Sequence, residues 1–409
     1  MQTMAQVPFE RKASVRVGFV GLGGRGRSLL GEMLACDGAE VIALADTYEA
    51  ATDRSAEMVV KAGQPVPHTF AGEHGWQQML GLDLDIVLIA TPWRTHTPIA
   101  VAMMEAGKHV GVEVPAAITL DECWHLVETS ERTRRHCIML ENCCYDYWEM
   151  IVKNMVKDNL FGTIVHAECA YIHEMRAMLL AAHGEGLWRR QGHMDRDGNL
   201  YPTHGLGPVA QILGIGKEDH FDYLVSMSSQ SLGLKEFRDI HFADDDPKRN
   251  EIYRCGDMNS SLIRTKLGRT ILLQHDVVTP RPYDRNFMIG GTRGTFRDYP
   301  PRIFLDSPAS HEESLSIDAH QWQSLDPYKK RYEDPLWTNL GELARKRGGH
   351  GGMDFIMIYR LLQTMHNGEP PDSDVYDAAE WSAPGPLSDL SVASRSSAVD
   401  FPDFRRLKA

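Results

Sequence analysis

The sequence lacks a basic excess and any long apolar run. Lys and Arg number 43 against 56 Asp and Glu, which gives a formal net charge of −13. A nucleic-acid surface needs a basic face to neutralise phosphate, so we expect no nucleic-acid partner. The longest clean apolar run, residues 86–90, has the length of a strand and falls far short of the roughly 20 residues that span a bilayer. We therefore expect no membrane partner either.

The sequence also lacks a disulfide pattern and an apolar leader. Its seven cysteines are odd in number and contain no C-x-x-C, and the adjacent Cys143 and Cys144 do not pair readily with each other. The first 14 residues carry Glu10, Arg11 and Lys12 and no apolar stretch, unlike a signal peptide. These features favour reduced thiols and a cytoplasmic location, or a periplasmic or secreted one if an export signal has been removed.

The composition that is present, 43% hydrophobic and 24% charged over 409 residues, is typical of a globular protein with two or three domains. Residues 1–142 alternate short apolar runs with helical stretches, which predicts an α/β Rossmann domain with a doubly wound parallel sheet. Residues 143–409 hold strands in series, which predicts an α+β domain with a large open, mostly antiparallel sheet. The tail 383–409 carries Phe401 and Phe404, so we expect it to pack rather than float.

The expected elements follow from these patterns. Strands are expected at 15–20, 40–45, 85–90, 109–114 and 137–141, then at 161–172, 222–228, 259–265, 270–278 and 287–296. Helices are expected at 97–106, 120–133, 335–347 and 353–365.

A glycine-rich turn follows the first expected strand. Gly21, Gly23 and Gly26 form G-x-G-x-x-G between a strand and a helix, an arrangement that lets a pyrophosphate approach the backbone. Asp46 ends the second strand, 20 residues past Gly26, where a carboxylate holds ribose hydroxyls and disfavours a 2′-phosphate. The pattern predicts NAD as cofactor. The alternatives are a turn without a ligand and, for Asp46, a helix cap.

Two further segments follow strands in the first domain. They are Thr91-Pro92 with His96, and Glu113-Val114-Pro115. With the glycine turn, these segments resemble the Gfo/Idh/MocA oxidoreductases, which pair a Rossmann domain with an open mixed sheet. Typical dehydrogenases of that family read Glu-Lys-Pro at the second segment, with the lysine near the reacting carbon. Val114 replaces that lysine here, which argues against ordinary sugar dehydrogenation.

The second domain is similar to glycoside hydrolase family 109. The similarity rests on Tyr171, Trp188-Arg189, Tyr201-Pro202-Thr203-His204, Pro280-Arg281-Pro282-Tyr283 and the glycine-rich residues 348–355. It extends from about residue 15 to residue 404. The founding activity of the family is an NAD-dependent α-N-acetylgalactosaminidase. This sequence lacks the paired-arginine export signal of many members and differs between Tyr171 and Arg189, so the aglycone or a sugar substituent could differ.

The resemblance implies two sets of contacts. The cofactor set is Gly21, Gly23, Gly24, Arg25, Gly26, Asp46, Trp93, Arg94, Thr95, His96, Glu113, Val114, Asn142 and Tyr201. The sugar set is Tyr171, Arg189, Tyr201, Pro202, Thr203, His204 and Tyr283. No metal is expected, because His173-Glu174 has no second histidine at metal-ligand spacing.

The sugar-facing motifs offer Tyr, His and Arg and no acidic pair, unlike ordinary glycosidases. This fits a retaining glycosidase in which C3 of the sugar is oxidised by bound NAD, C2 is deprotonated, the aglycone is eliminated, water adds at C1 and the hydride returns. His204 is the expected base for the C3 hydroxyl, with Tyr201 assisting. Tyr171 and Tyr283 would handle the C2 proton or the leaving group. Arg189 would stabilise an enolate or bind a substituent.

Each of these residues also has a structural explanation. His204 could be a capping or core histidine, Tyr283 a packed loop aromatic and Arg189 a solvated or stacked surface group.

Other functions remain open at this point. A glycosidase for another sugar, such as a sulfonated glucoside, would use Arg176, Arg189 and Arg190 as an anion clamp. An NAD-linked sugar dehydrogenase would accumulate NADH, and a non-catalytic NAD sensor would bind without turnover. By family resemblance, the open sheet of the second domain is the expected surface for a homodimer or higher homo-oligomer.

Overall fold

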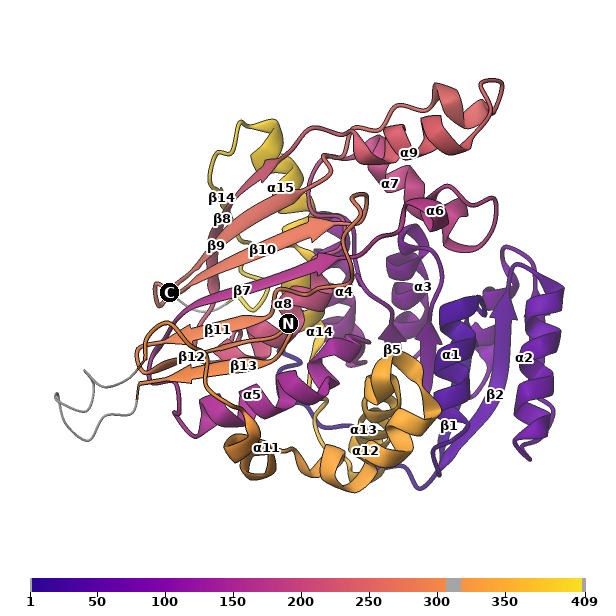
Figure 1. Ribbon diagram of the computed structural model, residues 1–409. Helices are drawn as coiled ribbons and strands as arrows, with labels where there is room; N and C mark the ends of the chain where they lie inside the picture. The colour runs from indigo at the N-terminus through magenta and orange to yellow at the C-terminus, as the bar shows by residue number, and fades with distance from the viewer. Residues whose placement is uncertain (1, 307–317, 407–409) are drawn as a thin grey trace. The chain divides into compact units, whose positions relative to one another are not determined.

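The computed structural model describes residues 2–306 and 318–406, and the chain divides into two compact units (Figure 1). The first unit comprises residues 2–142, 340–383 and 403–406, and the second comprises 143–306, 318–339 and 384–402. The first break falls after residue 142, where the sequence indicates it. The sequence predicts that residues 143–409 form the second domain, whereas residues 340–383 and 403–406 cluster with the first unit.

The first unit is built on a six-stranded parallel sheet with strand order β3-β2-β1-β4-β5-β6. The strands are β1 (Val15–Val20), β2 (Ala39–Asp46), β3 (His68–Ala71), β4 (Ile86–Ile89), β5 (His109–Val112) and β6 (Cys137–Met139). The connecting elements are α1 (Gly24–Met33), α2 (Glu49–Lys61), η1 (Gly75–Gly81), α3 (Trp93–Glu105) and α4 (Leu120–Thr133). The predicted Rossmann sheet is confirmed. Strand β3 was not predicted, because its four residues are largely exposed and give no apolar run.

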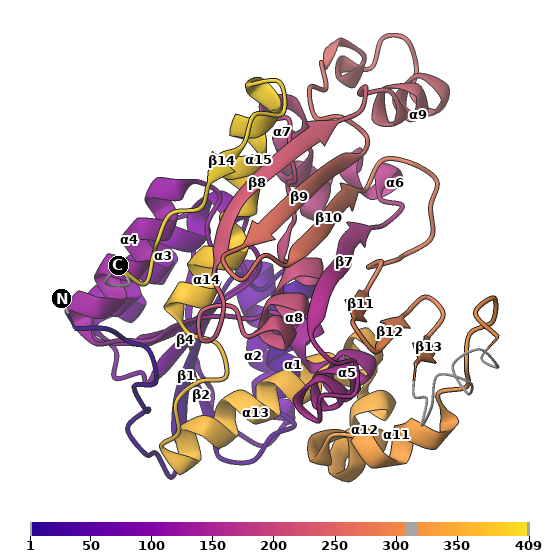
Figure 2. The same cartoon turned by 90° about the vertical axis from the view of Figure 1, so that its left-hand side faces the viewer.

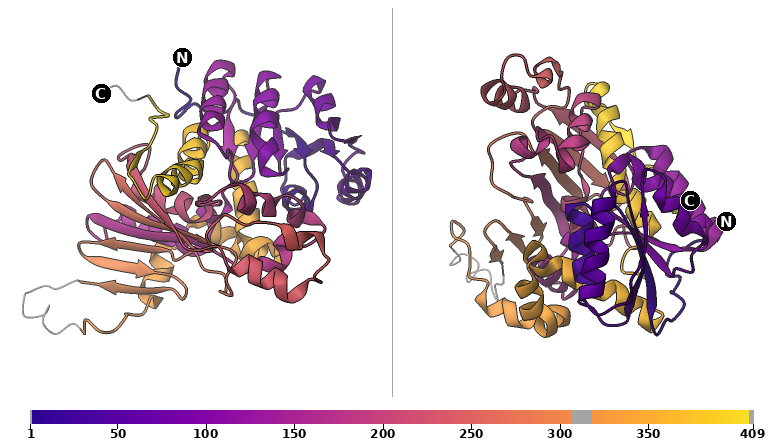
Figure 3. Two further views of the ribbon diagram at one scale, coloured as in Figure 1. Left: turned by 90° about the horizontal axis from the view of Figure 1, so that it is seen from above. Right: turned by 90° about the vertical axis from the view of Figure 1, so that its right-hand side faces the viewer.

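Helices cover both faces of this sheet (Figure 3, right). Strands β1, β4 and β5 are almost wholly buried, as continuous apolar runs require. Helix α3 begins at Trp93, directly after Pro92, and not at residue 97 as predicted. The strand order places the ends of β1 and β4 at the switch point of the sheet, where such folds bind ligands.

The C-terminal segments belong to the first unit because they bury apolar side chains on it. Helix α13 (Met353–Asn367) packs on α1, and α14 (Val375–Ser382) packs on α4 and β6. Phe404 is fully buried, with its ring centroid 4.8 Å from that of Trp124. Arg405 clamps this tail with a 2.7 Å contact to Asp377. The prediction that the tail packs is confirmed.

The second unit is built on an eight-stranded sheet with strand order β13-β12-β11-β7-β10-β9-β8-β14. The strands are β7 (Ile164–Ile172), β8 (Phe221–Ser228), β9 (Asn259–Thr265), β10 (Thr270–Asp276), β11 (Met288–Gly291), β12 (Gly294–Arg297), β13 (Arg302–Leu305) and β14 (Val399–Asp400). Among the described strands, β7 and β10 form the single parallel pair of this sheet, so the mostly antiparallel prediction is confirmed.

The predicted strand 287–296 is two strands. The chain turns at Thr292 and Arg293, whose amides donate to the carbonyls of Thr163 and Phe161. Gly290, Gly291 and Gly294 flank this turn, a glycine-rich hairpin signal that the single predicted strand overlooked.

Helices lie on one face of the second sheet (Figures 2 and 3). Helix α8 (Thr203–Leu213) packs on β7 and α15 (Pro384–Ala393) packs on β8. The other described helices of the second unit are α5 (Tyr147–Lys157), α6 (Arg176–Leu179), α7 (Arg189–Asp195), α9 (Gly233–His241) and α11 (Asp326–Tyr332), with short turns η2 (Asn142–Tyr145), η3 (Gly184–Leu187) and η4 (Pro247–Asn250). Helix α12 (Pro335–Arg347) runs from the second unit into the first, and η5 (Gly349–Gly352) belongs to the first. In residues 2–306 and 318–406, no helix combines the length and apolar character that a membrane span requires.

The packing of the tail gives a stability prediction. Phe404→Ala should lower the free energy of unfolding by about 3 kcal/mol, because it opens a cavity beside Trp124. Denaturant titration followed by fluorescence measures the loss. Tyr48→Ala, at a side chain that is 66% exposed, is the matched aromatic control and should change stability by less than about 0.5 kcal/mol. Equal losses for the two variants would contradict the buried role of Phe404.

Candidate functional site

The glycine turn between β1 and α1 has the geometry of an anion cradle. Gly21 has φ +88°, and a Cβ on Gly26 would lie 1.9 Å from the Gly21 carbonyl oxygen, so neither position accepts a side chain. No side chain caps the N-terminus of α1. A Cβ built on Gly23 or Gly24 would meet no described atom within 4 Å. Free amides of a helix N-terminus facing open space are what a pyrophosphate requires.

Asp46 links the end of β2 to this turn. Its Oδ2 accepts a 2.6 Å hydrogen bond from the Leu22 amide, and its Oδ1 accepts a 2.9 Å bond from the Tyr48 amide. The N-cap residue of α2 is Tyr48, so Asp46 is not that cap. The carboxylate lies at the carboxyl end of β2, next to the glycine turn, as the sequence predicts for a ribose-binding acid.

The first turn of α3 carries the four predicted cofactor residues Trp93, Arg94, Thr95 and His96. Arg94 and Thr95 are exposed, whereas His96 is buried. Both ring nitrogens of His96 face main-chain carbonyl oxygens, at 2.7 and 2.8 Å. Burial lowers the pKa of His96, while its contacts with the Pro115 and Thr91 carbonyls raise it. In the structure, His96 connects the loop after β5 to the start of α3 through these two contacts.

Asp354, which is not among the residues predicted from the sequence, is bonded by Arg25 and Asn142, and Arg25 links it to Glu113. Arg25 donates from Nε to Glu113 at 2.6 Å and from Nη1 to Asp354 at 2.7 Å. Asn142 Nδ2 donates to the other Asp354 oxygen at 2.7 Å, and His350 Nδ1 lies 2.8 Å from Asp354 Oδ2. The sequence feature that could have identified Asp354 as a site residue is its position in the glycine-rich motif 348–355.

Charge pairing sets the ionisation of this network. Burial would favour the neutral form of Asp354, but His350 and Arg25 hold its pKa well below the usual range. Burial likewise opposes the charge of Arg25, while Glu113 and Asp354 raise its pKa. Val114 follows Glu113 as a buried aliphatic side chain. The first unit thus has three features that fit NAD. They are the uncapped N-terminus of α1 for the pyrophosphate, Asp46 for the ribose, and the hydrogen-bonded network around Asp354.

In the second unit, four predicted rings come together. The ring centroid of Tyr171 lies 4.6 Å from that of Tyr201, 5.4 Å from that of His204 and 6.1 Å from that of Tyr283. The Tyr201 hydroxyl lies 3.4 Å from His204 Nε2. This group of residues, Tyr171, Tyr201, His204 and Tyr283, is called the ring cluster below.

The fold explains why these four rings meet. Tyr171 ends β7, and Tyr283 lies in the loop after β10, so the parallel β7–β10 pair brings both to the same edge of the sheet. Tyr201 lies just before α8, and His204 lies in its first turn. A Cβ on Gly205 would lie 2.7 Å from the Ala170 nitrogen, so α8 reaches β7 this closely because residue 205 is glycine.

Pro202 and Thr203 form the start of α8 itself. Both are buried, and Thr203 Oγ1 has no hydrogen-bond partner among the described residues. No side chain caps this helix, so His204 is not a capping residue.

Arg189, which is also in the predicted sugar set, lies beside the ring cluster. It is 8% exposed, its guanidinium carbon lies 4.7 Å from the Tyr201 ring centroid, and its Nη1 lies 2.9 Å from Glu185. Burial opposes its charge, but Tyr171, Tyr201 and Glu185 raise its pKa. The interpretation of Arg189 as a solvated surface group is therefore wrong.

The three arginines of the anion-clamp alternative each have an acidic partner. Glu174 pairs with Arg176, and Glu251 lies 3.0 Å from Arg190 Nε, as Glu185 does for Arg189. A carboxylate beside each guanidinium offsets the positive charge that would attract a sulfonate. This pairing weighs against the alternative.

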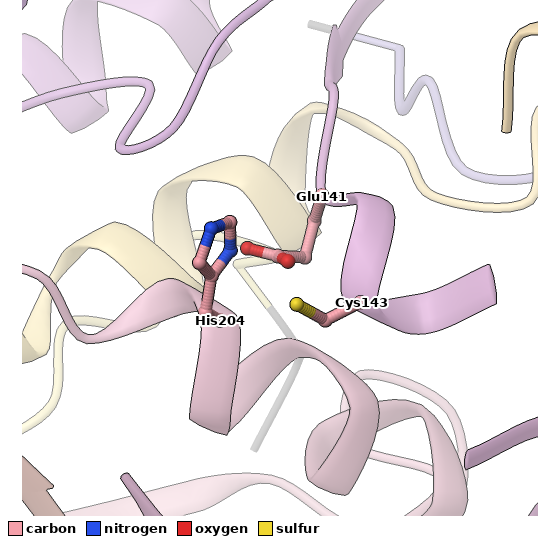
Figure 4. A group of neighbouring side chains, drawn as sticks. All are labelled: Glu141, Cys143 and His204. Atoms are coloured by element: carbon pink, nitrogen blue, oxygen red, sulfur yellow. The ribbon is translucent and has the colours of Figure 1, made fainter. Parts of the chain in front are cut away.

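Three residues near the ring cluster were not predicted as functional. His275 pairs with Tyr171 in the β7–β10 register and is buried with Nδ1 unpaired among the described residues, and His193 lies 6.4 Å from it, ring to ring. Burial lowers the pKa of His193 to about 4 and that of His275 well below its usual value, so both rings are neutral. Cys143 Sγ lies within 4.8 Å of a ring nitrogen of His204 (Figure 4). Isolated histidines and a cysteine of this kind carry no sequence pattern that separates them from packing residues.

A Rossmann unit that fits NAD, joined to an α+β unit with a polar ring cluster, defines the class of NAD-binding, oxidoreductase-like proteins. Comparison with known families agrees. The family described as "Oxidoreductase family, NAD-binding Rossmann fold" matches residues 15–140, and "Glycosyl hydrolase 109, C-terminal domain" matches residues 145–408. The chain belongs to glycosyl hydrolase family 109 and is an NAD-using glycoside hydrolase.

Individual relatives support this assignment. A glycosyl hydrolase family 109 protein from Solibacter usitatus is 52% identical over 100% of this chain and 92% of its own length. An alpha-N-acetylgalactosaminidase from Shewanella oneidensis is 45% identical over 96% of this chain and 85% of its own length. A solved levoglucosan dehydrogenase in complex with NADH and levoglucosan has a TM-score of 0.72 at 18% identity, covering 95% of this chain and 100% of its own. This last likeness concerns the fold alone.

The Asp354 network gives a pH prediction. Asp354→Asn should destabilise the protein by about 3 kcal/mol at pH 7, because it breaks a buried pair and leaves Arg25 with one partner. The folded-state pKa lies below the unfolded value, so the contribution of Asp354 is present above about pH 4 and is lost as pH falls through the folded pKa.

Thermal or urea unfolding between pH 8 and pH 2.5 measures this difference. The gap to the wild type should be constant down to about pH 5 and then narrow. Asp372→Asn, at a partly exposed partner of Arg360, is the control and should cost less than about 1 kcal/mol. A gap that widens on acidification would disprove the assignment.

Proposed function

We propose that the chain is a retaining α-N-acetylgalactosaminidase that oxidises its sugar transiently at C3. The observation that carries the proposal is the ring cluster, which joins three phenols, an imidazole and Arg189 in a chain with an NAD-binding unit. The name of the Shewanella oneidensis relative supports the choice of sugar.

Two acidic residues of the second unit, Glu185 and Asp276, are already engaged with other groups, which supports this choice over an ordinary two-carboxylate mechanism. Glu185 is paired with Arg189. Asp276, next to His275, accepts hydrogen bonds from the amides of Val278 and Thr279 and from the Thr279 hydroxyl. A glycosidase of the usual kind needs two available carboxyl groups flanking the bond, roughly 5 to 9.5 Å apart. The proton-carrying groups of this cluster are instead phenols and an imidazole.

The residues that would hold NAD are those of the glycine turn, Asp46, the start of α3 and the Arg25 network. When bound there, NAD supplies a reversible hydride acceptor for C3 of the sugar. His204 takes the proton of the C3 hydroxyl, since imidazole is a base that works near neutral pH. Tyr201, whose hydroxyl is 3.4 Å from His204 Nε2, orients that ring and would contact the sugar and the cofactor when these are bound.

The remaining steps are proton transfers. With C3 at the ketone level, the proton on C2 is acidic, and Tyr171 removes it and later returns it. Burial raises the pKa of Tyr171 while the charge of Arg189 lowers it, so Arg189 favours the phenolate that this role requires. Arg189 also stabilises the enolate that forms on the sugar. Tyr283 carries the proton of the glycosidic oxygen.

Turnover in D₂O tests the function. An aryl α-N-acetylgalactosaminide should release its aglycone, keep its anomeric configuration and carry deuterium at C2 of the product, without net absorbance from NADH. Product NMR and absorbance measure these outcomes. Stoichiometric NADH with the glycosidic bond intact would make the protein a dehydrogenase and overturn the proposal.

A substitution tests the base. His204→Ala should lower kcat about 100-fold to 10,000-fold, the usual range for loss of a general base. His166→Ala is the matched control, because His166 lies in the same unit with Nδ1 bonded to Thr270, and it should keep wild-type kcat. Equal activity of the two variants would remove His204 from the mechanism.

We also propose that the chain forms a homodimer or higher homo-oligomer through the open face of its second sheet. Alternation along the strands leaves apolar side chains opposite the helices: Met227 is 65% exposed and Leu262 44%, and Val225, Leu272 and Met288 are half-buried. An apolar face of this kind favours association with a second copy.

Introducing two negative charges on that face tests the proposed homo-oligomer. Met227→Glu with Leu262→Glu should reduce the mass in solution to that of a monomer by light scattering. Leu267→Glu, at a 63% exposed turn residue, should leave the mass unchanged. A wild type that is monomeric at every concentration would refute the proposal.

A further inference from the structure

A buried ionic group lies behind Tyr283. Arg285, two residues further along the loop, is 2% exposed. Its Nη2 lies 2.6 Å from Glu149 Oε1 and 3.3 Å from Asp146 Oδ2, and its Nε donates to Glu149 Oε1 at 3.1 Å. Asp146 is the N-cap of α5, where it accepts a 3.0 Å bond from the Trp148 amide. The guanidinium is therefore clamped against the first turn of a helix.

The remaining guanidinium nitrogen faces the ring cluster. Arg285 Nη1 donates to the Tyr283 hydroxyl oxygen at 3.2 Å, and the guanidinium carbon lies 5.8 Å from the centre of that ring. Tyr283 itself is 38% exposed. One end of this contact is thus a fixed buried cation, and the other is a phenol that solvent and substrate can reach.

A cation that donates to a phenol oxygen stabilises the phenolate more than the phenol. Desolvation raises the pKa of Tyr283, and Arg285 opposes this through its charge and its hydrogen bond. The other titratable groups facing Tyr283 are Tyr171 in β7, His173 directly after it, Tyr299 after β12, and Cys143 in η2. Among the described neighbours of Tyr283, Arg285 is the cation that donates a hydrogen bond to its hydroxyl oxygen.

We propose that Arg285 is a positioning residue that holds Tyr283 as the acid and base at the glycosidic oxygen. The inference rests on the proposed function. As the C1–O bond breaks, the Tyr283 phenol gives its proton to the departing oxygen, which takes the bonding electron pair. The phenolate left behind is stabilised by Arg285. When water adds at C1, the phenolate takes one proton from it and becomes phenol again, so protons and charge balance over the cycle.

A series of aryl glycosides tests this role. A good leaving group, such as a dinitrophenol, departs without an acid, whereas a poor one, such as an alkylphenol, requires protonation. Arg285→Gln should lower kcat about 100-fold for poor leaving groups and less than about 3-fold for the best one. Arg285→Lys, which keeps the charge without the planar fork, should restore part of the loss.

A double-substitution cycle separates positioning from folding. In a Tyr283→Phe background the phenol oxygen is absent, so Arg285→Gln should cause no further loss of kcat on poor leaving groups. Arg269→Gln is the matched control for removing a partly buried arginine, because Arg269 bonds the Leu213 carbonyl and Asp219 elsewhere in the unit. It should leave the dependence on leaving group unchanged, whatever its effect on stability.

The outcomes are distinct. A loss that is equal for all leaving groups, or that persists in the Tyr283→Phe background, overturns the role of Arg285. A wild type that releases no aglycone from any glycoside overturns the proposed function instead.

Discussion

The close packing of α8 on β7 is the constraint on which the site of the second unit depends. Gly205 lets the helix approach until a Cβ would touch the backbone of Ala170, at 2.7 Å. This approach sets His204, in the first turn of α8, against Tyr171 at the end of β7, with ring centroids 5.4 Å apart. Because protein interiors pack at crystal-like density, even one added methyl group here would displace the helix and the ring it carries.

Both units place their polar residues in the same physical way. Buried or half-buried guanidinium groups are fixed by carboxylates: Arg25 by Glu113 and Asp354, Arg189 by Glu185, and Arg285 by Glu149. Arg189 and Arg285 also contact rings of the ring cluster. Burying a charge is unfavourable unless it is paired and hydrogen-bonded, so such pairs contribute little net stability. What they supply is orientation, which catalysis requires and loose surface charges cannot give.

The parallel β7–β10 pair shows why the second domain was harder to predict than the first. In the first domain each strand is followed by a helix, so the local pattern already indicates a parallel sheet with ligand residues at its carboxyl edge. In the second domain, β7 pairs with β10 and β11, which lie far away in the sequence. The meeting of Tyr171 with Tyr283 follows from those distant pairings and not from local periodicity.

The sequence by itself determined the glycine turn after the first strand and the motifs of the family, because glycine spacing and short motifs carry direct chemical constraints. It also indicated that the tail around Phe404 would be buried. Only the tertiary structure decided that residues 340–383 complete the first unit, that Asp354 is the centre of the Arg25 network, and that Arg285 lies behind Tyr283. These facts depend on which charges become buried together, and a single buried Asp or Arg looks like a surface residue until the packing around it is known.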